Sequence, residues 1–243
     1  DLMDMDSVRS AVNSLPTVID GLIMNAGGIG GRTPNAKTDA GVTHMFAMNV
    51  HGHAQLADEL IAAGKLKNVA IIAGSGASRG EPKVRLKAPT FETSSVEELA
   101  SVVDGSWQEG KHKAMEAYAA SKYVAALWIG SMARKHPSIR FVTMCPGGTN
   151  GTAGADSMQG LQRIFVKYIG KPLMVALGMM HNVETGAARY INALTDETYK
   201  SGVFYASSAD AMIGDVVNQA TIFTDFGNEN FQDNAYEAIH RFL

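Results

Sequence analysis

The sequence has 243 residues, 46% of them hydrophobic and 19% charged, with a net charge of −3 and one cysteine, Cys145. This length and composition are typical of a single globular domain with a sizeable core. The negative charge argues against a nucleic-acid partner, because phosphates bind basic surfaces. A lone cysteine excludes an intrachain disulfide and suits a reducing compartment, so we expect a cytoplasmic protein. No apolar run reaches the about 18 residues that a membrane span requires.

Short apolar runs alternate with helical patterns along the chain. The runs that predict buried parallel strands are 18–25, 68–74, 139–145 and 202–207. Hydrophobic periodicity predicts helices over 43–64, 114–135 and 182–194, the last with Asn182 as its N-cap. This alternation indicates an α/β fold with a doubly wound parallel sheet of Rossmann type. In such sheets ligands bind beyond the carboxyl ends of the strands.

Glycine-rich loops follow three of the predicted strands: NAGGIGG (25–31), GSGASRG (74–80) and CPGGTNGT (145–152). Each loop by itself is compatible with ordinary flexible structure. A phosphate-binding loop over 74–80 would require a helix directly after it. The following EPKVRLKAP has two prolines and no helical period, so we reject that interpretation. The alternative is that this loop presents the Ser75 hydroxyl at the end of a strand.

A phenol and an ammonium are spaced to share a helix face. Tyr118 and Lys122 lie four positions apart in EAYAASKYVAA (116–126), one helical turn from each other. Composition alone produces such pairs by chance, so the pair has meaning only together with its neighbours. Asn49 lies inside the predicted helix 43–64, flanked by Met48 and Val50, which makes a buried polar role plausible beside the ordinary solvent-facing one.

Six short features occur in the order typical of one enzyme family. They are DL (1–2), NAG (25–27), MNVHGH (48–53), the strand end at Ser75, YAASK (118–122) and PG (146–147). Together they resemble the short-chain dehydrogenase/reductase family, and the resemblance covers essentially the whole chain.

The resemblance implies a role for each polar residue of the catalytic type. Tyr118 would be the acid/base, and the nearby Lys122 ammonium would favour the phenolate and lower the phenol pKa from about 10. Ser75 would hydrogen-bond the substrate oxygen. Lys122 would also hold the nicotinamide ribose, and Asn49 would anchor a water that passes protons to Lys122.

The resemblance also implies contacts with a dinucleotide. Asn25, Ala26 and Gly27 would line the adenosine side, with Asp1 and Leu2 at the adenine. Pro146, Gly147 and Thr149 would meet the carboxamide. Thr152 competes with Thr149 for the family's threonine role, because the spacing after Pro146 fits neither perfectly. The family's paired Asn before Ala-Gly is Met24-Asn25 here, which changes packing more than chemistry.

Two departures from the family pattern concern the length of the chain. The sequence begins where the family's third strand ends, so we expect an N-terminally incomplete copy of a single Rossmann-type domain (1–243) that lacks the first strands and binds dinucleotide poorly. An insertion at about 79–115 resembles that of monomeric carbonyl reductases, retinol dehydrogenases and light-dependent protochlorophyllide reductases. Those relatives mostly use NADP, so we expect NADP rather than NAD. The resemblance to the monomeric carbonyl reductases also leads us to expect a monomer.

Other residues allow competing interpretations. KVRLK (83–87) is read as a solvated edge strand, with contact to an anionic substrate or a cofactor phosphate as the alternative. His51 and His53 point about 200° apart on a helix and cannot share a metal ion, so we expect packing histidines and no metal site.

Cys145 is expected to be a buried small hydrophobe rather than a nucleophile. Residues 147–181 correspond to the family's substrate lid, and LMVALGMM (173–180) suits either an apolar substrate or an ordinary core helix.

We therefore expect an NAD(P)-dependent oxidoreductase that interconverts a carbonyl and an alcohol of a small molecule by hydride transfer, with Tyr118 as acid/base. One alternative is an NADPH-dependent C=C reductase of protochlorophyllide reductase type, for which the long insertion is the main indication. Another is a dinucleotide-binding protein without catalysis, against which the presence of all four polar residues of catalytic type weighs.

Overall fold

Five strands form one sheet in the computed structural model, which describes residues 1–29, 33–108, 113–151, 168 and 170–243. The strands stand in the order of the chain, and the first four are mutually parallel, whereas the fifth pairs antiparallel with the fourth. Four of them confirm the predicted strands. The fifth was not predicted, because it is a short edge segment without a buried apolar run. The strands are β1 (Ile19–Met24), β2 (Leu66–Ala73), β3 (Arg140–Met144), β4 (Val203–Ser207) and β5 (Val216–Asn218).

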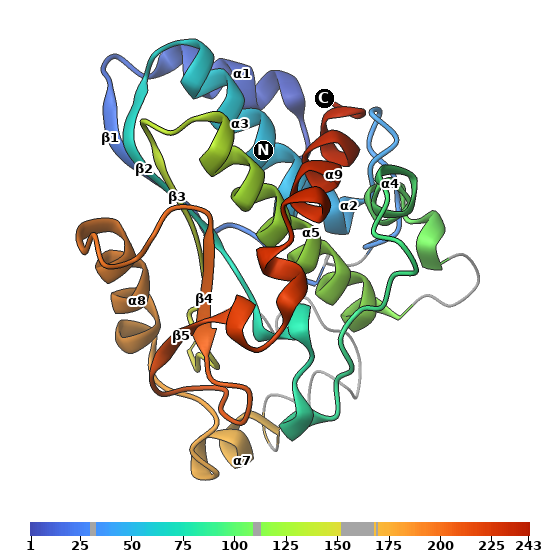
Figure 1. Cartoon of the computed structure of the whole chain (residues 1–243), viewed down its shortest axis with the longest axis vertical. Coiled ribbons are helices and arrows are strands. Elements are labelled where there is room, and N and C mark those ends of the chain that lie inside the picture. Colours follow the sequence, from blue (N-terminus) through green and yellow to red (C-terminus); the bar gives the residue numbers. More distant parts are fainter. Residues whose placement is uncertain (30–32, 109–112, 152–167, 169) are drawn as a thin grey trace.

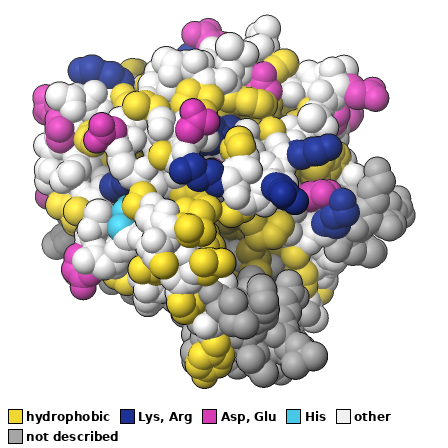
Figure 2. Space-filling model, turned by 90° about the horizontal axis from the view of Figure 1, so that it is seen from below, with side chains coloured by type: hydrophobic (Ala, Val, Ile, Leu, Met, Phe, Trp, Pro, Cys, Tyr) yellow, Lys and Arg dark blue, Asp and Glu magenta, His cyan; other side chains and the backbone are white. Residues whose placement is uncertain are grey.

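The parallel register brings several loops to one edge of the sheet. Ile71 of β2 pairs with Ile23 of β1 and with Val142 of β3, so these strands run level with one another. Their carboxyl ends therefore meet at the same edge, which points downward in Figure 1 and faces the viewer in Figure 2. The chain leaves this edge at Asn25, Gly74 and Cys145, which begin the three glycine-rich loops.

Helices cover both faces of the sheet, as the predicted doubly wound fold requires (Figure 1). On one face, Ile72 and Phe141 belong to a large core cluster formed with the helices α3, α5 and α9. On the other face, Ile71 and Val142 pack against α8. Successive strand residues thus alternate between two cores, as expected from strand geometry. The helices are α1 (Met5–Ser14), α3 (Gly52–Ala62), α5 (Ala114–Lys135), α8 (Val183–Thr195) and α9 (Glu229–His240).

Helix α5 is the central helix of the larger core, and it confirms the predicted 114–135. It has alanines at many of its inward positions, whereas Tyr123 and Trp128 fill the core and are fully buried. The predicted N-cap of α8 is also confirmed, since the Asn182 side chain accepts a hydrogen bond from Thr185 N at 2.9 Å. Helix α9, near the C-terminus, was not predicted, and it packs along α5.

The predicted helix 43–64 is confirmed but is not regular. It starts as α2 (His44–Phe46), widens into a π-helical turn, η1 (Ala47–His51), and continues as α3. Such turns occur frequently at functional sites. Here the turn contains Asn49.

The insertion is folded against the main core. Its helix α4 (Val96–Asp104) is capped by Ser95 and packs against α9 and α5. An aromatic cluster joins the same segment to α5. The Phe91 ring lies 5.0 Å from the Tyr123 ring and 5.4 Å from the Trp107 ring, measured between centroids.

The predicted edge strand over 83–87 is wrong. Residues Pro82–Val84 form a 3₁₀ turn, η3, and Arg85 is left-handed, with φ 54°. The turn closes through backbone hydrogen bonds between Glu81 and Leu86 of 2.8 and 3.1 Å. Pro82 suits the first position of this turn, because its fixed φ of about −65° lies in the range of a 3₁₀ helix. The predicted solvent exposure is correct, because residues 82–85 and Lys87 are exposed.

The described part of the lid region includes helix α7 (Lys171–Ala176). Leu173 and Leu177 are 55% and 63% exposed, so the interpretation of 173–180 as an ordinary core helix is wrong. Residues 152–167 of the predicted lid lie outside the described residues. Among the helices that the structure does describe, none combines the length and the apolar character needed to cross a membrane.

The contact between α5 and α9 predicts the effect of one substitution. A Cβ on Gly130 would clash with the carboxamide of Gln232, a buried side chain that donates to Phe226 O at 2.7 Å and could move aside only by losing this bond. In an open helix, replacing glycine by alanine would stabilise by about 1 kcal/mol. Here overpacking of about 1–3 kcal/mol outweighs that gain, so Gly130→Ala should lower the free energy of unfolding in urea. A variant as stable as or more stable than the wild type would contradict this packing.

Candidate functional site

Ser75 follows β2 and starts a tight turn. The chain forms the 3₁₀ helix η2 (Gly76–Arg79), and the Ser75 hydroxyl accepts a hydrogen bond from Ala77 N at 3.3 Å. The Ser78 hydroxyl donates to Ser75 O at 2.7 Å. These bonds fix the direction of the Ser75 side chain, and they confirm that a 3₁₀ turn follows, not the long helix that a phosphate-binding loop needs.

The structure brings Ser75, Tyr118 and Lys122 together. The Ser75 side chain lies near the Tyr118 hydroxyl and favours its ionised form. One turn along α5, the buried Lys122 ammonium lies 5.8 Å from the centroid of the Tyr118 ring and donates to Ala73 O at 2.8 Å. Lys122, which was predicted to lower the Tyr118 pKa, is thus anchored to the end of β2, and Ser75 follows this strand.

The expected lowering of the Tyr118 pKa is wrong for the protein alone. Burial raises the pKa of Tyr118 to about 12, with Ser75 opposing the rise and Cys145 adding to it. Burial also lowers the pKa of Lys122 to about 8, opposed by Cys145. Loss of hydration disfavours the charged form of each group and is the largest influence on both pKa values. The phenol is therefore a protonated acid at neutral pH.

Asn49 is fully buried and binds the loop after β1. Its amide nitrogen donates to Gly28 O at 2.6 Å and to Met45 O at 2.7 Å, and its oxygen accepts from Gly28 N at 3.1 Å. Both amide hydrogens are thus used within the protein. The predicted proton-relay water would have to bind an acceptor on Asn49 instead, and that role remains a prediction.

The residues predicted to line the adenosine side lie beside the start of α3. His53 Nε2 donates to Ala26 O at 2.7 Å, which fixes the segment of Asn25, Ala26 and Gly27 against this helix. A Cβ on Gly52 would lie 2.0 Å from Leu2 O, so only glycine lets the N-terminal segment approach so closely. Asp1 and Leu2 are therefore at the same end of α3 as Ala26, and their contact with adenine remains a prediction.

The loop after β3 is held by two side chains that sequence reasoning missed. Arg189 donates to Cys145 O at 3.1 Å, and His181 Nε2 donates to Pro146 O at 2.7 Å. Gly147 has φ +80°, and the Thr149 hydroxyl donates to Gly147 O at 3.1 Å. Arg189 and His181 come from α8 and the turn before it, and neither occurs in a recognisable motif. The competing candidate Thr152 lies outside the described residues.

The remaining reactive residues behave as packing groups. Cys145 is 8% exposed and burial raises the pKa of its thiol, as expected of a small buried hydrophobe and not of a nucleophile. His51 Nε2 bonds to Phe242 O at 2.9 Å. In the part of the chain that the structure describes, no three His, Cys, Asp or Glu side chains are grouped to hold a metal ion.

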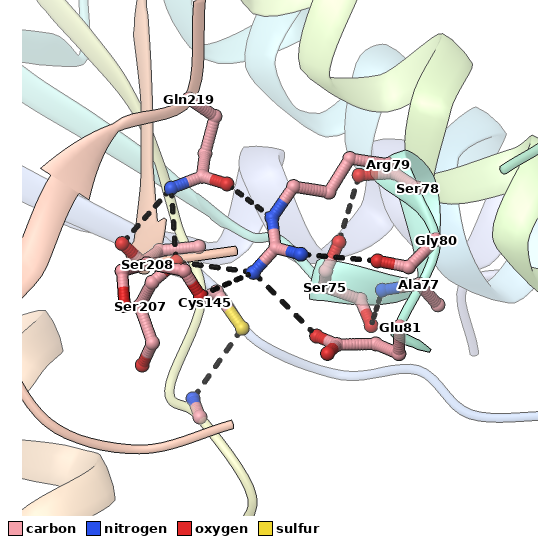
Figure 3. Close-up of polar contacts among 12 residues, drawn as sticks. Ser75, Ala77, Ser78, Arg79, Gly80, Glu81, Cys145, Ser207, Ser208 and Gln219 are labelled. Atoms are coloured by element: carbon pink, nitrogen blue, oxygen red, sulfur yellow. Dashed lines mark hydrogen bonds and ion pairs between the residues drawn. The ribbon is translucent and has the colours of Figure 1, made fainter. Parts of the chain in front are cut away.

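A buried arginine ties the Ser75 turn to the far end of the sheet (Figure 3). The Arg79 side chain is 2% exposed. It donates to Ser207 O and Ser208 O at 3.1 Å each, to Gly80 O at 3.0 Å and to the Gln219 carboxamide oxygen. Gln219 in turn donates to main-chain carbonyls of β4 and β5. The turn that carries Ser75 is therefore fixed to the ends of two more strands.

The Arg79 guanidinium faces one carboxylate at longer range. Glu81 Oε1 lies 3.8 Å from Arg79 Nη2, and the buried Glu81 Oε2 has no hydrogen-bond partner among the residues that the structure describes. Burial raises the pKa of Glu81, with the Arg79 charge opposing the rise. Sequence reasoning missed this cluster, although an arginine inside a glycine-rich loop at a strand end was a usable signal.

Solved structures of several proteins share this arrangement of strands and helices. An uncharacterised protein from Mycobacterium paratuberculosis matches with a TM-score of 0.66 at 17% identity, over 100% of this chain and 73% of that chain. A short-chain dehydrogenase family protein from Francisella tularensis matches with a TM-score of 0.54 at 17% identity, over 82% and 73%. The 3-alpha-hydroxysteroid dehydrogenase from Pseudomonas sp. B-0831, complexed with NADH, gives 0.54 at 20% identity, over 82% and 76%.

The chain has the fold of the short-chain dehydrogenases. Its parallel strands with helices on both faces are those predicted from the alternation of apolar runs and helical patterns. No protein-family model matches the sequence, and a comparison with curated proteins finds no match. The likeness therefore establishes the fold, and the chemistry has to be argued from the site itself.

The buried His53 predicts an acid-sensitive stability. Burial lowers the pKa of His53 from 6.5 to about 4, with the Ala26 hydrogen bond opposing this and the Lys122 charge adding to it. As pH falls through this window the unfolded chain takes up a proton that the folded protein excludes, so stability falls. Between pH 7 and pH 5, His53 should account for a loss of about 2 kcal/mol in the free energy of unfolding.

Guanidinium unfolding of the wild type and of His53→Gln at both pH values measures this loss. The glutamine amide can still donate to Ala26 O but does not titrate, so the variant should lose less stability on acidification. Equal losses in the two proteins would contradict the argument.

Proposed function

We propose that this protein is a short-chain dehydrogenase/reductase that uses a nicotinamide dinucleotide to interconvert a carbonyl and an alcohol. The observation that carries the proposal is the meeting of Ser75 and the Tyr118 hydroxyl beside the buried Lys122 ammonium. The three side chains lie at the carboxyl edge of a parallel sheet, where α/β folds bind their ligands.

The residues present fit a dinucleotide. An ammonium has three hydrogens to donate, and in the described part of the chain the buried Lys122 has one acceptor, Ala73 O. The other two hydrogens can be donated to ribose hydroxyls, and these bonds would satisfy the buried ammonium. The similar Pseudomonas enzyme is complexed with NADH, which supports this cofactor class. We retain NADP as the preferred form because of the long insertion.

Each side chain would have a definite part in reduction. The cofactor supplies the hydride when bound. Tyr118, protonated because of its raised pKa of about 12, donates a proton to the carbonyl oxygen. Ser75 hydrogen-bonds that oxygen and orients it, and the Lys122 charge stabilises the phenolate that remains. The neutral phenol present in the protein alone is the form that carbonyl reduction requires.

We also propose that the protein acts as a monomer. The insertion helix α4 packs against both α5 and α9. The insertion therefore covers part of α5, a helix that would otherwise be available to a second copy. This supports the interpretation made from the resemblance to the monomeric carbonyl reductases.

Removal of the phenol hydroxyl tests the proposed acid. Tyr118→Phe should lower kcat about a thousandfold in the reduction of aldehydes or ketones, because the proton donor is lost while the ring remains. The matched control is Tyr123→Phe on the same helix. That hydroxyl bonds to Asp225 at 3.0 Å, away from the site, so turnover should persist. Unchanged turnover by Tyr118→Phe would rule out this mechanism.

The lowered pKa of Lys122 predicts a pH dependence. Burial lowers this pKa from 10.5 to about 8, so the ammonium loses its proton as pH rises through that value. A neutral amine stabilises the phenolate less, so kcat/KM for reduction should fall about tenfold from pH 7 to pH 9. Lys122→Met should be slow at both pH values and lack this fall. A wild-type profile that stays flat up to pH 9.5 would contradict the assignment.

A further inference from the structure

Exposed apolar side chains are concentrated at the carboxyl edge of the sheet. Among the described residues eleven large hydrophobic side chains are exposed, and six of them belong to three segments, 82–87, 113–118 and 170–183. We call these three segments the carboxyl-edge face. Exposed apolar surface that is gathered in one region is typical of a site that binds another molecule or a membrane. The six side chains are Val84, Met115, Leu173, Val175, Leu177 and Val183.

The three segments lie past the carboxyl ends of the strands. The first follows the turn that starts at Ser75. The second is at the start of α5, which meets the end of β2 at the bond from Lys122 to Ala73 O, so the residues before Lys122 extend past the sheet. The third is tied to the loop after β3, because His181 N donates to Gly148 O at 2.8 Å. Figure 2 views the molecule from this side.

Helix α7, in the third segment, exposes apolar side chains on opposite sides. Leu173 and Leu177 are 55% and 63% exposed and are separated by about 40° around the helix axis. Val175 is 41% exposed and points about 160° away from both. A flat protein surface or a bound small molecule would cover one side of such a helix. Lipid surrounds an inserted helix and covers all sides, so lipid suits α7 best.

The position and size of α7 also suit a membrane surface. Figure 1 shows α7 at the lower end of the molecule, beyond the ends of the strands. The helix has 6 residues, which corresponds to a length of about 9 Å. Helices that lie in the interface of a bilayer bury their apolar side chains by about 5–10 Å. Insertion of α7 to this depth would leave the sheet and its two cores in water.

The carboxyl-edge face is positively charged in a chain whose net charge is −3. Its exposed cations include Lys83, Arg85 and Lys87, and their side chains have neither a hydrogen bond nor an ion pair with any residue that the structure describes. Lys113 is also exposed and is paired with Glu116 at 2.8 Å. The sequence of the third segment contains a lysine and no acidic residue. Figure 2 shows Lys and Arg side chains on the same side of the molecule as hydrophobic ones.

We propose that the carboxyl-edge face binds the surface of a membrane that contains anionic lipids. Leu173, Val175 and Leu177 enter the boundary between headgroups and acyl chains, and the cations of residues 83–87 contact the lipid phosphates. The attachment is peripheral, in agreement with the absence of a membrane-spanning helix from the described part of the chain. This inference is independent of the proposed function, because it rests on exposed surface and not on the reaction.

Vesicle binding tests the proposal directly. Sedimentation of the whole protein with vesicles of phosphatidylcholine, with and without about 30 mol% phosphatidylserine, measures the two affinities. The protein should bind the anionic vesicles at least about tenfold more tightly, because each cation near an anionic surface contributes about a fivefold increase. High salt should reduce this preference, because it screens the charges. Equal binding to the two kinds of vesicle, or no binding to either, would overturn the proposal.

Substitutions in α7 test the apolar contribution. The double variant Leu173→Ser with Leu177→Ser should bind both kinds of vesicle at least about tenfold more weakly, because two apolar side chains no longer leave water. Ile191→Ser is the matched control, since Ile191 is 52% exposed but lies on α8, outside the carboxyl-edge face. Binding that is lost equally in the double variant and in the control would contradict the assigned surface.

Substitutions of single cations test the electrostatic contribution. Arg85→Gln and Lys87→Gln should each weaken binding to the anionic vesicles about fivefold and leave binding to phosphatidylcholine unchanged. Lys67→Gln removes the same charge from an exposed side chain near the start of β2, at the opposite edge of the sheet. It should bind like the wild type. An effect of Lys67→Gln as large as that of Arg85→Gln would reduce the preference to net charge and overturn the assigned face.

Two further measurements identify a different occupant of α7. If the double variant raises the KM for an aldehyde and the wild type does not bind vesicles, the apolar side chains belong to the substrate site. If the wild type self-associates in sedimentation velocity and the double variant does not, a second copy covers them. Either result overturns the proposal. Vesicle binding by a protein without turnover retains the proposal and overturns the proposed function.

Discussion

The hydrogen bond from Lys122 to Ala73 O is the contact on which the arrangement of the site depends. It joins the central helix to the last residue of β2, and Ser75 follows two residues later. Because the ammonium is buried, it needs an acceptor, and the strand carbonyl supplies one. The same bond therefore fixes how far α5 extends past the sheet and where the Tyr118 hydroxyl lies relative to Ser75.

Around this contact, polar groups are buried near one edge of the sheet, and their burial lowers the stability of the fold. Lys122, Arg79, Glu81 and Asn49 are all largely withdrawn from water. Arg79 and Asn49 are compensated by main-chain hydrogen bonds, whereas Glu81 Oε2 is not. Unsatisfied or strained groups concentrated at the same place are more typical of a binding region than of a structural core, where each buried polar group finds a partner.

The sequence was sufficient to predict the parts of the fold with strong local patterns. Apolar runs of strand length and the long alanine-rich helix were recognised because burial on one or both faces imposes a period on the residues. The π-helical turn at Asn49, the edge strand Val216–Asn218 and the turn at Arg85 were missed. These depend on contacts with distant segments, and no local period reports such contacts.

The residues of the site also divide into those with a recognisable sequence pattern and those that depend on distant contacts. Ser75, Tyr118 and Lys122 were identified because their order in the chain is distinctive, and the structure brings them together. The sign of the Tyr118 pKa shift was predicted wrongly, because desolvation depends on how completely the surroundings exclude water, which spacing does not reveal. Arg79, Arg189 and His181 were missed because they bind main-chain carbonyls, and any residue type can supply those.

The Arg79 cluster has a consequence for how the protein would lose the proposed activity. One guanidinium connects the turn that starts at Ser75 with the ends of β4 and, through Gln219, with β5 at the sheet margin. Fraying of that margin would release the turn while the central strands and α5 remain folded. Inactivation under mild denaturing conditions would thus precede the cooperative loss of secondary structure. The β4–β5 edge of the sheet would be the least stable of the elements that hold the Ser75 turn in place.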